Sequence, residues 1–229
     1  EPESILNEIS EVAKKGIKEV VLTGIHIASY GKDFSDKNEN STDEHMDICV
    51  EQKENCDEYG KDDLHSGPYR LIDLLEQINK IDGIDRVRLG SIEPKLINED
   101  FVKRLSKLDK ICHHFHLSLQ SGCDETLKRM NRRYTTAEFE QSAKMLRNAF
   151  DDVHLTTDII VGFPGETEKE FETTYEFLKK IKFYKTHIFK YSPRRGTAAE
   201  KMQNQVDGKI KEERSKALIE LSNKNELDY

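Results

Sequence analysis

The feature that most constrains the fold is a regular alternation of helical and strand-like segments along the chain. Apolar residues recur at helical spacing near residues 4–15, 71–78, 98–108, 139–149, 166–178 and 210–226. Between them, short apolar or alternating runs are predicted to be strands, at residues 20–22, 86–91, 115–120, 153–161 and 186–191. This alternation predicts a parallel sheet built from right-handed crossovers, and therefore an α/β fold.

The first predicted strand carries its own expectation about burial. Val20, Val21 and Leu22 form an uninterrupted apolar run, which is typical of a parallel strand that is covered on both faces.

Five strands are too few for a closed eight-stranded barrel. At 229 residues the chain could hold one large domain or two small ones, and the alternation favours one.

A polar cluster follows every predicted strand. The clusters are T-G-I-H, G-S-I-E-P, L-Q-S-G, G-F-P-G-E and Y-S-P-R-R-G-T. Because the carboxyl ends of parallel strands meet at one edge of the sheet, we expect these clusters to assemble a single site there.

The segment 114–134 combines a strand, a turn and a basic helix within about twenty residues. Ser121-Gly122 breaks the strand, and Asp124 is predicted to cap the next helix, as Ser4 is predicted to cap the first. The segment could present ligand-binding groups at the turn. It could equally be an ordinary connection that leads into a solvated basic helix.

Two further positions suggest a binding site. Asp158 lies inside an otherwise apolar strand, and a carboxylate there needs a partner, so we expect it to bind a ligand or join a polar network. Gly24 would allow a ligand to approach the backbone closely, and His26 and Tyr30 could face the same opening. His26 could also be a loop histidine bonded to backbone.

The charge of the chain is unevenly distributed. Residues 32–65 hold twelve of the 44 acidic and four of the 36 basic residues, which leaves 32 of each elsewhere. High charge and low hydropathy predict that 32–67 is a disordered acidic insertion. The basic clusters at 128–133 and 190–195 could bind phosphates, or could be solvated helix and loop ends.

The four cysteines show no metal-ligand spacing and are predicted to be free thiols, so we expect no metal ligands in this chain. No apolar run approaches eighteen residues, and the chain begins with EPES rather than a signal sequence. We therefore expect a cytoplasmic protein that does not associate with membranes.

Taken in order, five motifs resemble those of the radical S-adenosylmethionine (radical SAM) enzymes, and within them the tRNA methylthiotransferases. They are LTGIHIASYG at 22–31, RVRLGSIEP at 86–94, HLSLQSG with MNRRYT at 116–122 and 130–135, DIIVGFPGETEKEF at 158–171, and FKYSPRRGTAA at 189–199. The sequences of the first, second and fifth motifs are most similar to those of enzymes that act on threonylcarbamoyladenosine. Related members modify isopentenyladenosine in tRNA or an aspartate of a ribosomal protein.

The most important departure of the chain from the family concerns its cysteines, and T-G-I at 23–25 also departs from the family's glycine-rich motif. The family's CxxxCxxC motif, which binds a 4Fe-4S cluster, does not occur here. The resemblance therefore implies an excised central fragment of a six-stranded partial barrel, (β/α)6 and TIM-like, that lacks the first strand and the cluster loop. It also implies that an N-terminal domain with a second cluster and a C-terminal RNA-binding domain are absent. The fragment alone is expected to be inactive, and to be a monomer.

By resemblance, several residues would contact S-adenosylmethionine. Thr23 and Gly24 would lie against its methionine moiety and Arg133 would pair with its carboxylate. The other expected cofactor contacts are His26, Ser91, Glu93, Gln120, Ser121, Asp158, Ile160, Gly162, Tyr191 and Ser192. No catalytic side chain is assigned.

The resemblance also implies the reaction and the partners. An electron donor would reduce the cluster, S-adenosylmethionine would be cleaved to a deoxyadenosyl radical, and carbon 2 of the modified adenine would receive a methylthio group. Lys190, Arg194 and Arg195 would meet tRNA phosphates, although a solvated loop explains them equally well. A fragment that binds nucleoside or tRNA without catalysis is a further alternative.

Overall fold

The computed structural model describes residues 1–24, 27–31 and 69–228. His26 and the predicted acidic insertion at 32–67 lie outside these described residues. Within them, no helix is both long enough and apolar enough to cross a membrane.

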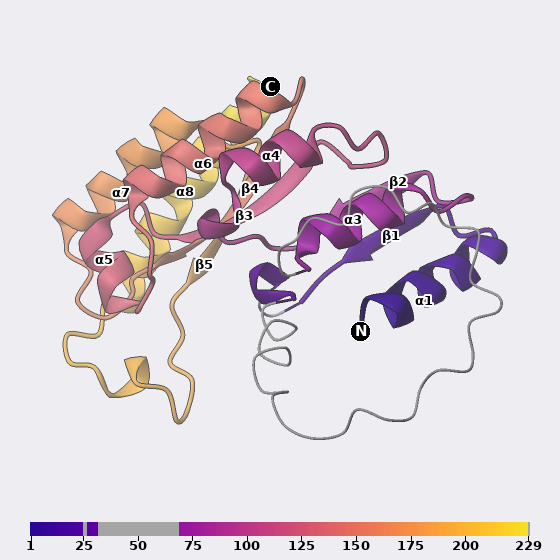
Figure 1. Ribbon diagram of the computed structural model, residues 1–229. Helices are drawn as coiled ribbons and strands as arrows, with labels where there is room; N and C mark the ends of the chain where they lie inside the picture. The colour runs from indigo at the N-terminus through magenta and orange to yellow at the C-terminus, as the bar shows by residue number, and fades with distance from the viewer. Residues whose placement is uncertain (25–26, 32–68, 229) are drawn as a thin grey trace, which may run out of the picture.

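The predicted alternation of helices and strands is confirmed (Figure 1). The strands are β1 (Glu19–Leu22), β2 (Arg86–Leu89), β3 (His114–Gln120), β4 (His154–Val161) and β5 (Lys185–Lys190). The helices are α1 (Pro2–Lys14), α3 (Leu71–Asn79), α4 (Glu99–Leu105), α5 (Asp124–Arg129), α6 (Thr136–Ala149), α7 (Glu168–Ile181) and α8 (Gly208–Leu227). Short 3-10 turns occupy Ile27–Ser29, Pro94–Leu96 and Ala199–Lys201.

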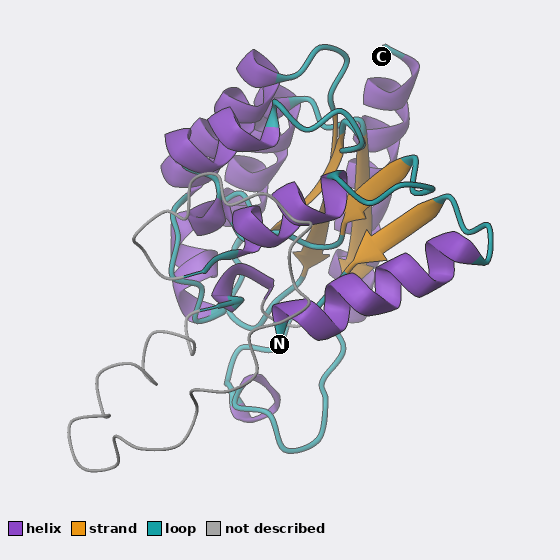
Figure 2. Ribbon diagram, turned by 45° about the vertical axis from the view of Figure 1, so that its right-hand side comes forward, coloured by secondary structure: helices purple, strands orange, loops and turns teal. Residues whose placement is uncertain are grey.

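The strands form two parallel sheets, ordered β1-β2 and β3-β4-β5, as expected for right-handed crossovers. Two isolated parallel bridges, Val87 to Ile111 and Ile92 to Leu117, join the sheets. The strands and the helices outside them thus make a partial TIM-like barrel (Figure 2).

The period-two pattern of β3 is confirmed by its burial. Phe115, Leu117 and Leu119 are all fully buried. The intervening His116 and Ser118 are only partly buried and face the opposite side of the sheet. This arrangement directs the apolar face of β3 into the core and leaves its polar face for the interior of the partial barrel.

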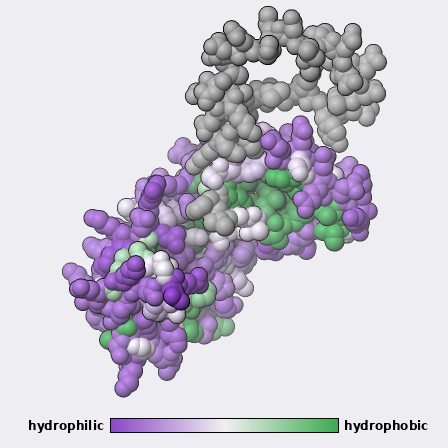
Figure 3. Space-filling model, turned by 90° about the horizontal axis from the view of Figure 1, so that it is seen from below, coloured by the Kyte–Doolittle hydropathy of each residue, from purple (hydrophilic) through white to green (hydrophobic). Residues whose placement is uncertain are grey.

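The expectation that β1 is buried on both faces is wrong. Val20 and Leu22 pack against the core, but Val21 is 54% exposed. Val21 points to the face of β1 opposite to that of Val20 and Leu22, and this face is left largely uncovered by the described elements. Figure 3 shows apolar side chains exposed on the same half of the molecule, whereas the other half is mostly hydrophilic in that view.

Both predicted caps are also wrong. Helix α1 begins at Pro2 after Glu1, which places Ser4 within its first turn. Helix α5 takes Cys123 as its N-cap, and Asp124 instead accepts a hydrogen bond from the Thr136 amide at 2.7 Å. The carboxylate therefore links the start of α5 to the start of α6.

A close contact of two main chains joins Gly31 to Tyr69. Gly31 has a φ of +84°, and a Cβ at this position would collide with the carbonyl group of Tyr69. The rings of Tyr30 and Tyr69 pack edge to face beside this contact, with centroids 6.4 Å apart. Only glycine can occupy this position without displacing the backbone.

Candidate ligand cavity at the carboxyl edge of the sheet

A cavity of about 600 Å³ lies where β3, β4 and β5 end. Its volume is within the usual range for small-molecule sites. Seven residues predicted from the sequence line it, namely Gln120, Asp158, Ile160, Lys190, Tyr191, Ser192 and Arg194. Phe189, Thr197 and Ala199 complete the lining. The structure therefore brings together the predicted residues of the last three strands.

Gln120 ends β3 in an unusual conformation. It has a φ of 72°, in the left-handed region, and the register between β3 and β4 shifts between Leu117 and this residue. Non-glycine residues in this region are uncommon and concentrate at functional sites. Tyr134 fixes the strand end, because its hydroxyl donates to the carbonyls of Ser118 and Leu119. Burial raises the pKa of this hydroxyl to about 12.

A cluster of two histidines and one carboxylate lies next to the cavity. His116 Nε2 and Asp158 Oδ2 are 3.3 Å apart, and His116 Nδ1 lies 3.0 Å from Thr156 Oγ1. The ring of His187 lies 5.9 Å from that of His116, centroid to centroid. Asp158 thus has the polar network that its place in an apolar strand led us to expect. His187 was missed, although it lies directly opposite Asp158 in the register of β4 and β5, on the less buried face of the sheet.

The G-F-P-G-E turn is held from outside the cavity. The Gly162 amide donates to Glu166 Oε2 at 2.6 Å, and Arg214 of α8 donates to the same oxygen at 2.8 Å. The Arg214 and Glu166 side chains are only 6% and 2% exposed. A Cβ at Gly162 would collide with Lys211 of α8. The turn is therefore pinned to α8, and Gly162 faces that helix rather than the cavity.

Tyr191 supplies a polar atom that needs a partner. Its amide donates to the Val161 carbonyl at 2.9 Å, which fixes the residue at the cavity wall. Its ring packs on Phe163 and beneath the Lys211 ammonium. Its hydroxyl is buried and has no hydrogen-bond partner among the residues that the structure describes. Buried hydroxyls are normally paired, so a ligand in this cavity would satisfy it.

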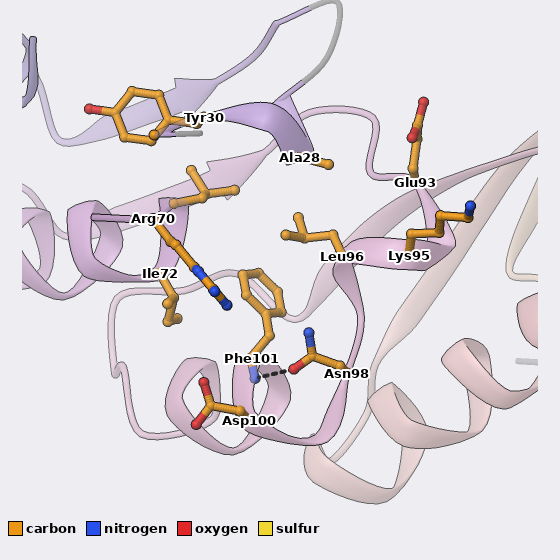
Figure 4. Close-up of a pocket in the computed structure, with 12 residues that line it drawn as sticks. Ala28, Tyr30, Arg70, Ile72, Glu93, Lys95, Leu96, Asn98, Asp100 and Phe101 are labelled. Atoms are coloured by element: carbon orange, nitrogen blue, oxygen red, sulfur yellow. Dashed lines mark hydrogen bonds between the residues drawn. The ribbon is translucent and has the colours of Figure 1, made fainter. Parts of the chain in front are cut away.

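The predicted residues of β1 and β2 do not line this cavity. Glu93 lines a second cavity of about 420 Å³ with Tyr30, Arg70 and Phe101 (Figure 4). Thr23 lies against Gly90, and Gly24 is near the Ile27 amide.

The remaining expected contacts are also elsewhere. Ser91 and Arg133 are exposed to solvent and do not line the cavity. Ser121 is buried, and its hydroxyl contacts Thr174 Oγ1 and the Cys123 amide. The Ser121 side chain is therefore engaged in holding the turn against α7.

The basic residues differ in their availability to phosphates. Lys190 pairs with Glu212 at 2.7 Å, and both terminal nitrogens of Arg129 bind Glu170 at 2.8 Å. Arg194 lines the cavity and Arg195 is exposed beside it. Neither forms a salt bridge within the described part of the chain. These two arginines are therefore the better candidates for an anionic ligand.

The two groups that the sequence resemblance implies fit the structure differently. S-Adenosylmethionine fits the cavity, because Ile160 and Tyr191 offer apolar and aromatic surface and Gln120, Asp158 and the unpaired Tyr191 hydroxyl offer polar contacts. A 4Fe-4S cluster has no ligand set among the described residues. Cys112 precedes β3 and Cys123 follows it, so they lie at opposite edges of the sheet. Burial also raises the pKa of the Cys123 thiol.

Solved structures support the fold. Coproporphyrinogen III oxidase from Escherichia coli, a radical SAM enzyme, superposes with a TM-score of 0.56 at 15% identity, over 66% of this chain and 36% of that one. The radical S-adenosylmethionine methyltransferase TsrM from Kitasatospora setae superposes with a TM-score of 0.55, also at 15% identity, over 83% of this chain and 31% of its own.

Curated sequences are more similar. The threonylcarbamoyladenosine tRNA methylthiotransferase MtaB of Bacillus subtilis is 36% identical over 100% of this chain and 44% of its own length. The tRNA-2-methylthio-N(6)-dimethylallyladenosine synthase of Thermoanaerobacter sp. is 37% identical over 99% of this chain and 42% of its own. The chain thus spans less than half the length of these relatives.

The model of one protein family matches most of the chain. It is that of the radical SAM superfamily, it covers residues 1–178, and the superfamily implies S-adenosylmethionine and a 4Fe-4S cluster as cofactors. The matched residues include β1 to β4 and most of α7, and so the elements that carry Gln120, Asp158 and Ile160. The chain belongs to the radical SAM superfamily.

Proposed function

We propose that this chain is the core of an enzyme that methylthiolates a modified adenosine in tRNA, with threonylcarbamoyladenosine as the substrate. The observation that carries the proposal is the cavity at the ends of β3, β4 and β5, because all ten residues that line it belong to the motifs that resemble methylthiotransferases. The relative at 36% identity is named as a threonylcarbamoyladenosine tRNA methylthiotransferase, and the relative at 37% as a tRNA-2-methylthio-N(6)-dimethylallyladenosine synthase. S-Adenosylmethionine, when bound, supplies the adenosyl group that abstracts hydrogen.

The residues of the chain would position this cofactor and exclude water. Ile160 and Tyr191 would hold the adenine between apolar and aromatic surfaces, and the Tyr191 hydroxyl would gain a hydrogen-bond partner. Gln120 and Asp158 would bind polar groups deeper in the cavity. Excluding water from the reactive group prevents side reactions with solvent. The iron–sulfur clusters and the electron donor would have to come from outside the residues described here.

The charge at the cavity entrance supports a tRNA substrate. Arg194 and Arg195 follow β5 and are free of salt bridges within the described ranges, so their guanidinium groups are available to phosphate oxygens. The body of the chain outside residues 32–65 is close to neutral, so these side chains need not overcome a strongly repulsive net charge.

One alternative substrate has a specific observation in its favour. The relatives named as dimethylallyladenosine synthases are as similar to this chain as those named for threonylcarbamoyladenosine. The cavity itself contains both apolar and polar groups, and could accept either modified base. Substrate choice is therefore the point on which the proposal must be tested.

The test uses the full product of the gene that encodes this chain, loaded with iron and sulfide under anaerobic conditions. It is incubated with S-adenosylmethionine, a reductant and tRNA carrying either threonylcarbamoyladenosine or dimethylallyladenosine. Digestion to nucleosides and mass spectrometry should show a methylthio group on threonylcarbamoyladenosine. Transfer only to dimethylallyladenosine would assign the alternative substrate. Transfer to neither tRNA, by a preparation that still cleaves S-adenosylmethionine, would reject the tRNA proposal.

A further inference from the structure

We propose that His116, Asp158 and His187 form a binding site for a divalent transition-metal ion such as Zn²⁺. The three side chains come from β3, β4 and β5 and offer two imidazole nitrogens and one carboxylate oxygen. These ligand atoms all lie within 4.8 Å of one another. The site contains no cysteine.

The sheet itself brings the three residues together. Neighbouring parallel strands place His116 opposite Thr156 and Asp158 opposite His187. Asp158 lies two residues beyond Thr156 on β4, so its side chain is on the same face of the sheet as those of Thr156 and His116. The positions are therefore fixed by backbone pairing rather than by flexible loops, as precise metal sites require.

The distance between the first two ligands suits a shared ion. At metal–ligand bonds of about 2.1 Å, two adjacent ligands of one metal lie roughly 3.0 to 3.4 Å apart. His116 Nε2 and Asp158 Oδ2 are 3.3 Å apart. His187 is exposed, and a change of its rotamer would bring its imidazole to the same ion.

His116 also has the outer contact that a metal ligand needs. Its Nδ1 lies 3.0 Å from Oγ1 of Thr156, which is itself buried. If Nδ1 carries the ring proton and donates a hydrogen bond to this hydroxyl, the lone pair of Nε2 faces the Asp158 carboxylate. A cation is then needed between Nε2 and the carboxylate. Metal-binding histidines usually have their second nitrogen held in this way, which fixes the tautomer and the ring orientation.

The site leaves a coordination position open toward the cavity. Asp158 belongs both to this group and to the cavity lining, next to Gln120. Three protein ligands with a remaining position for water or a substrate oxygen are typical of reactive rather than structural metal sites, and two histidines with one carboxylate suit Zn²⁺, Fe²⁺ or Co²⁺. A bound ion would thus present a positive charge beside the cavity.

A simple hydrogen bond between His116 and Asp158 is the competing explanation. It accounts for the 3.3 Å contact but gives His187 no role. The two explanations differ in what happens when His187 is removed, because only a metal site would lose affinity for the ion.

The experiment is a titration of the metal-stripped 229-residue chain with Co²⁺ and with Zn²⁺. Visible absorption of Co²⁺ should show one equivalent bound without the strong near-ultraviolet band of thiolate ligands, and a chelating dye should report the affinity for Zn²⁺. His187→Ala and Asp158→Asn should each weaken binding at least tenfold. His113→Ala is the matched control, because it removes an exposed histidine just before the start of β3.

Circular dichroism of each variant checks that it is folded. His187 is exposed and Asp158→Asn preserves shape, so both variants should fold. Failure of the parent chain to bind one equivalent, or equal binding by parent and His187→Ala, would overturn the proposal. Neither outcome depends on S-adenosylmethionine or tRNA, so the proposed reaction would remain open to its own test.

Discussion

The two sheets of this molecule differ in how completely they are packed. The β1–β2 sheet has strands of four residues, and Val21 in β1 is more than half exposed. The β3–β4–β5 sheet has strands of six to eight residues, and Leu117, Leu155 and Ile159 are fully buried. The cavity and the His–Asp–His cluster belong to the second sheet. The chain thus builds its polar site on the sheet with the longer strands.

One ion pair from each region gives a second contrast. Arg214 and Glu166 are almost fully buried beside β4, whereas Arg86 and Glu19 join β2 to β1 at the surface. Breaking a buried pair by removing one partner leaves a charge without compensation, but a surface pair contributes little. Substitutions matched between the two regions test this contrast.

The largest effect is expected at the buried pair. Arg214→Ala should lower the free energy of unfolding by about 3–5 kcal/mol, because Glu166 is left buried without its cation. The matched change Arg86→Ala should leave the urea midpoint close to that of the parent. Urea unfolding followed by circular dichroism measures both. Equal losses in the two variants would show that the regions do not differ as their burial suggests.

The next largest difference in the free energy of unfolding is expected between apolar side chains of the two sheets. Leu155→Ala should lower the free energy of unfolding by about 2–5 kcal/mol, since it opens a cavity beneath β4. Val21→Ala should change it by no more than about 0.5 kcal/mol, because the side chain is already exposed. Chemical denaturation of the two variants tests this directly. A large loss for Val21→Ala would indicate that another layer covers β1 in solution.

A smaller effect depends on pH. Hydrogen bonds from Arg129 lower the pKa of Glu170 below its usual value of 4.5. The folded pKa is depressed, so this pair contributes its full stability above pH about 4.5 and loses it as the pH falls through the folded pKa. Urea midpoints measured from pH 7 to pH 3 should therefore decline more steeply for the parent than for Glu170→Gln. Arg86 also lowers the pKa of Glu19 at the edge of the other sheet, and Glu19→Gln provides the comparison. Parallel pH curves for parent and Glu170→Gln would contradict this prediction.

The smallest effect concerns the cofactor. Tyr191→Phe should weaken S-adenosylmethionine binding by the cluster-loaded gene product about 2- to 10-fold, the usual value of one hydrogen bond. Thr23→Val, in the other half of the molecule, should have less effect because Thr23 does not line the cavity. Equilibrium dialysis measures both. A larger loss for Thr23→Val would place the cofactor nearer to β1 than we propose.

Much of the architecture could be predicted from the sequence, because helix and strand periodicities are local. The five strands, their parallel direction and the gathering of Gln120, Asp158 and Tyr191 are confirmed. The errors concern tertiary surroundings. The apolar run that includes Val21 does not reveal which layers cover it, and the side chain of Asp124 has its partner, Thr136, on another helix.

The site was predictable only in part for the same reason. Asp158 stood out as a carboxylate in an apolar strand, but His116 and His187 lie on other strands and could be joined to it only through the register of the sheet. Lys190 was expected to be available to phosphates, and its partner Glu212 lies on a helix that follows much later. Pairing across the fold cannot be inferred from local spacing.

The contact between Gly31 and Tyr69 has a practical consequence for protein engineering. Because the two main chains already touch, a few glycine and serine residues would suffice to join them directly. The entropy of closing a loop rises only with the logarithm of its length, by about 0.6 kcal/mol for each doubling. Versions for crystallisation in which a short linker joins Gly31 to Tyr69 should therefore preserve the barrel. The same holds for versions with a reporter domain inserted between these two residues.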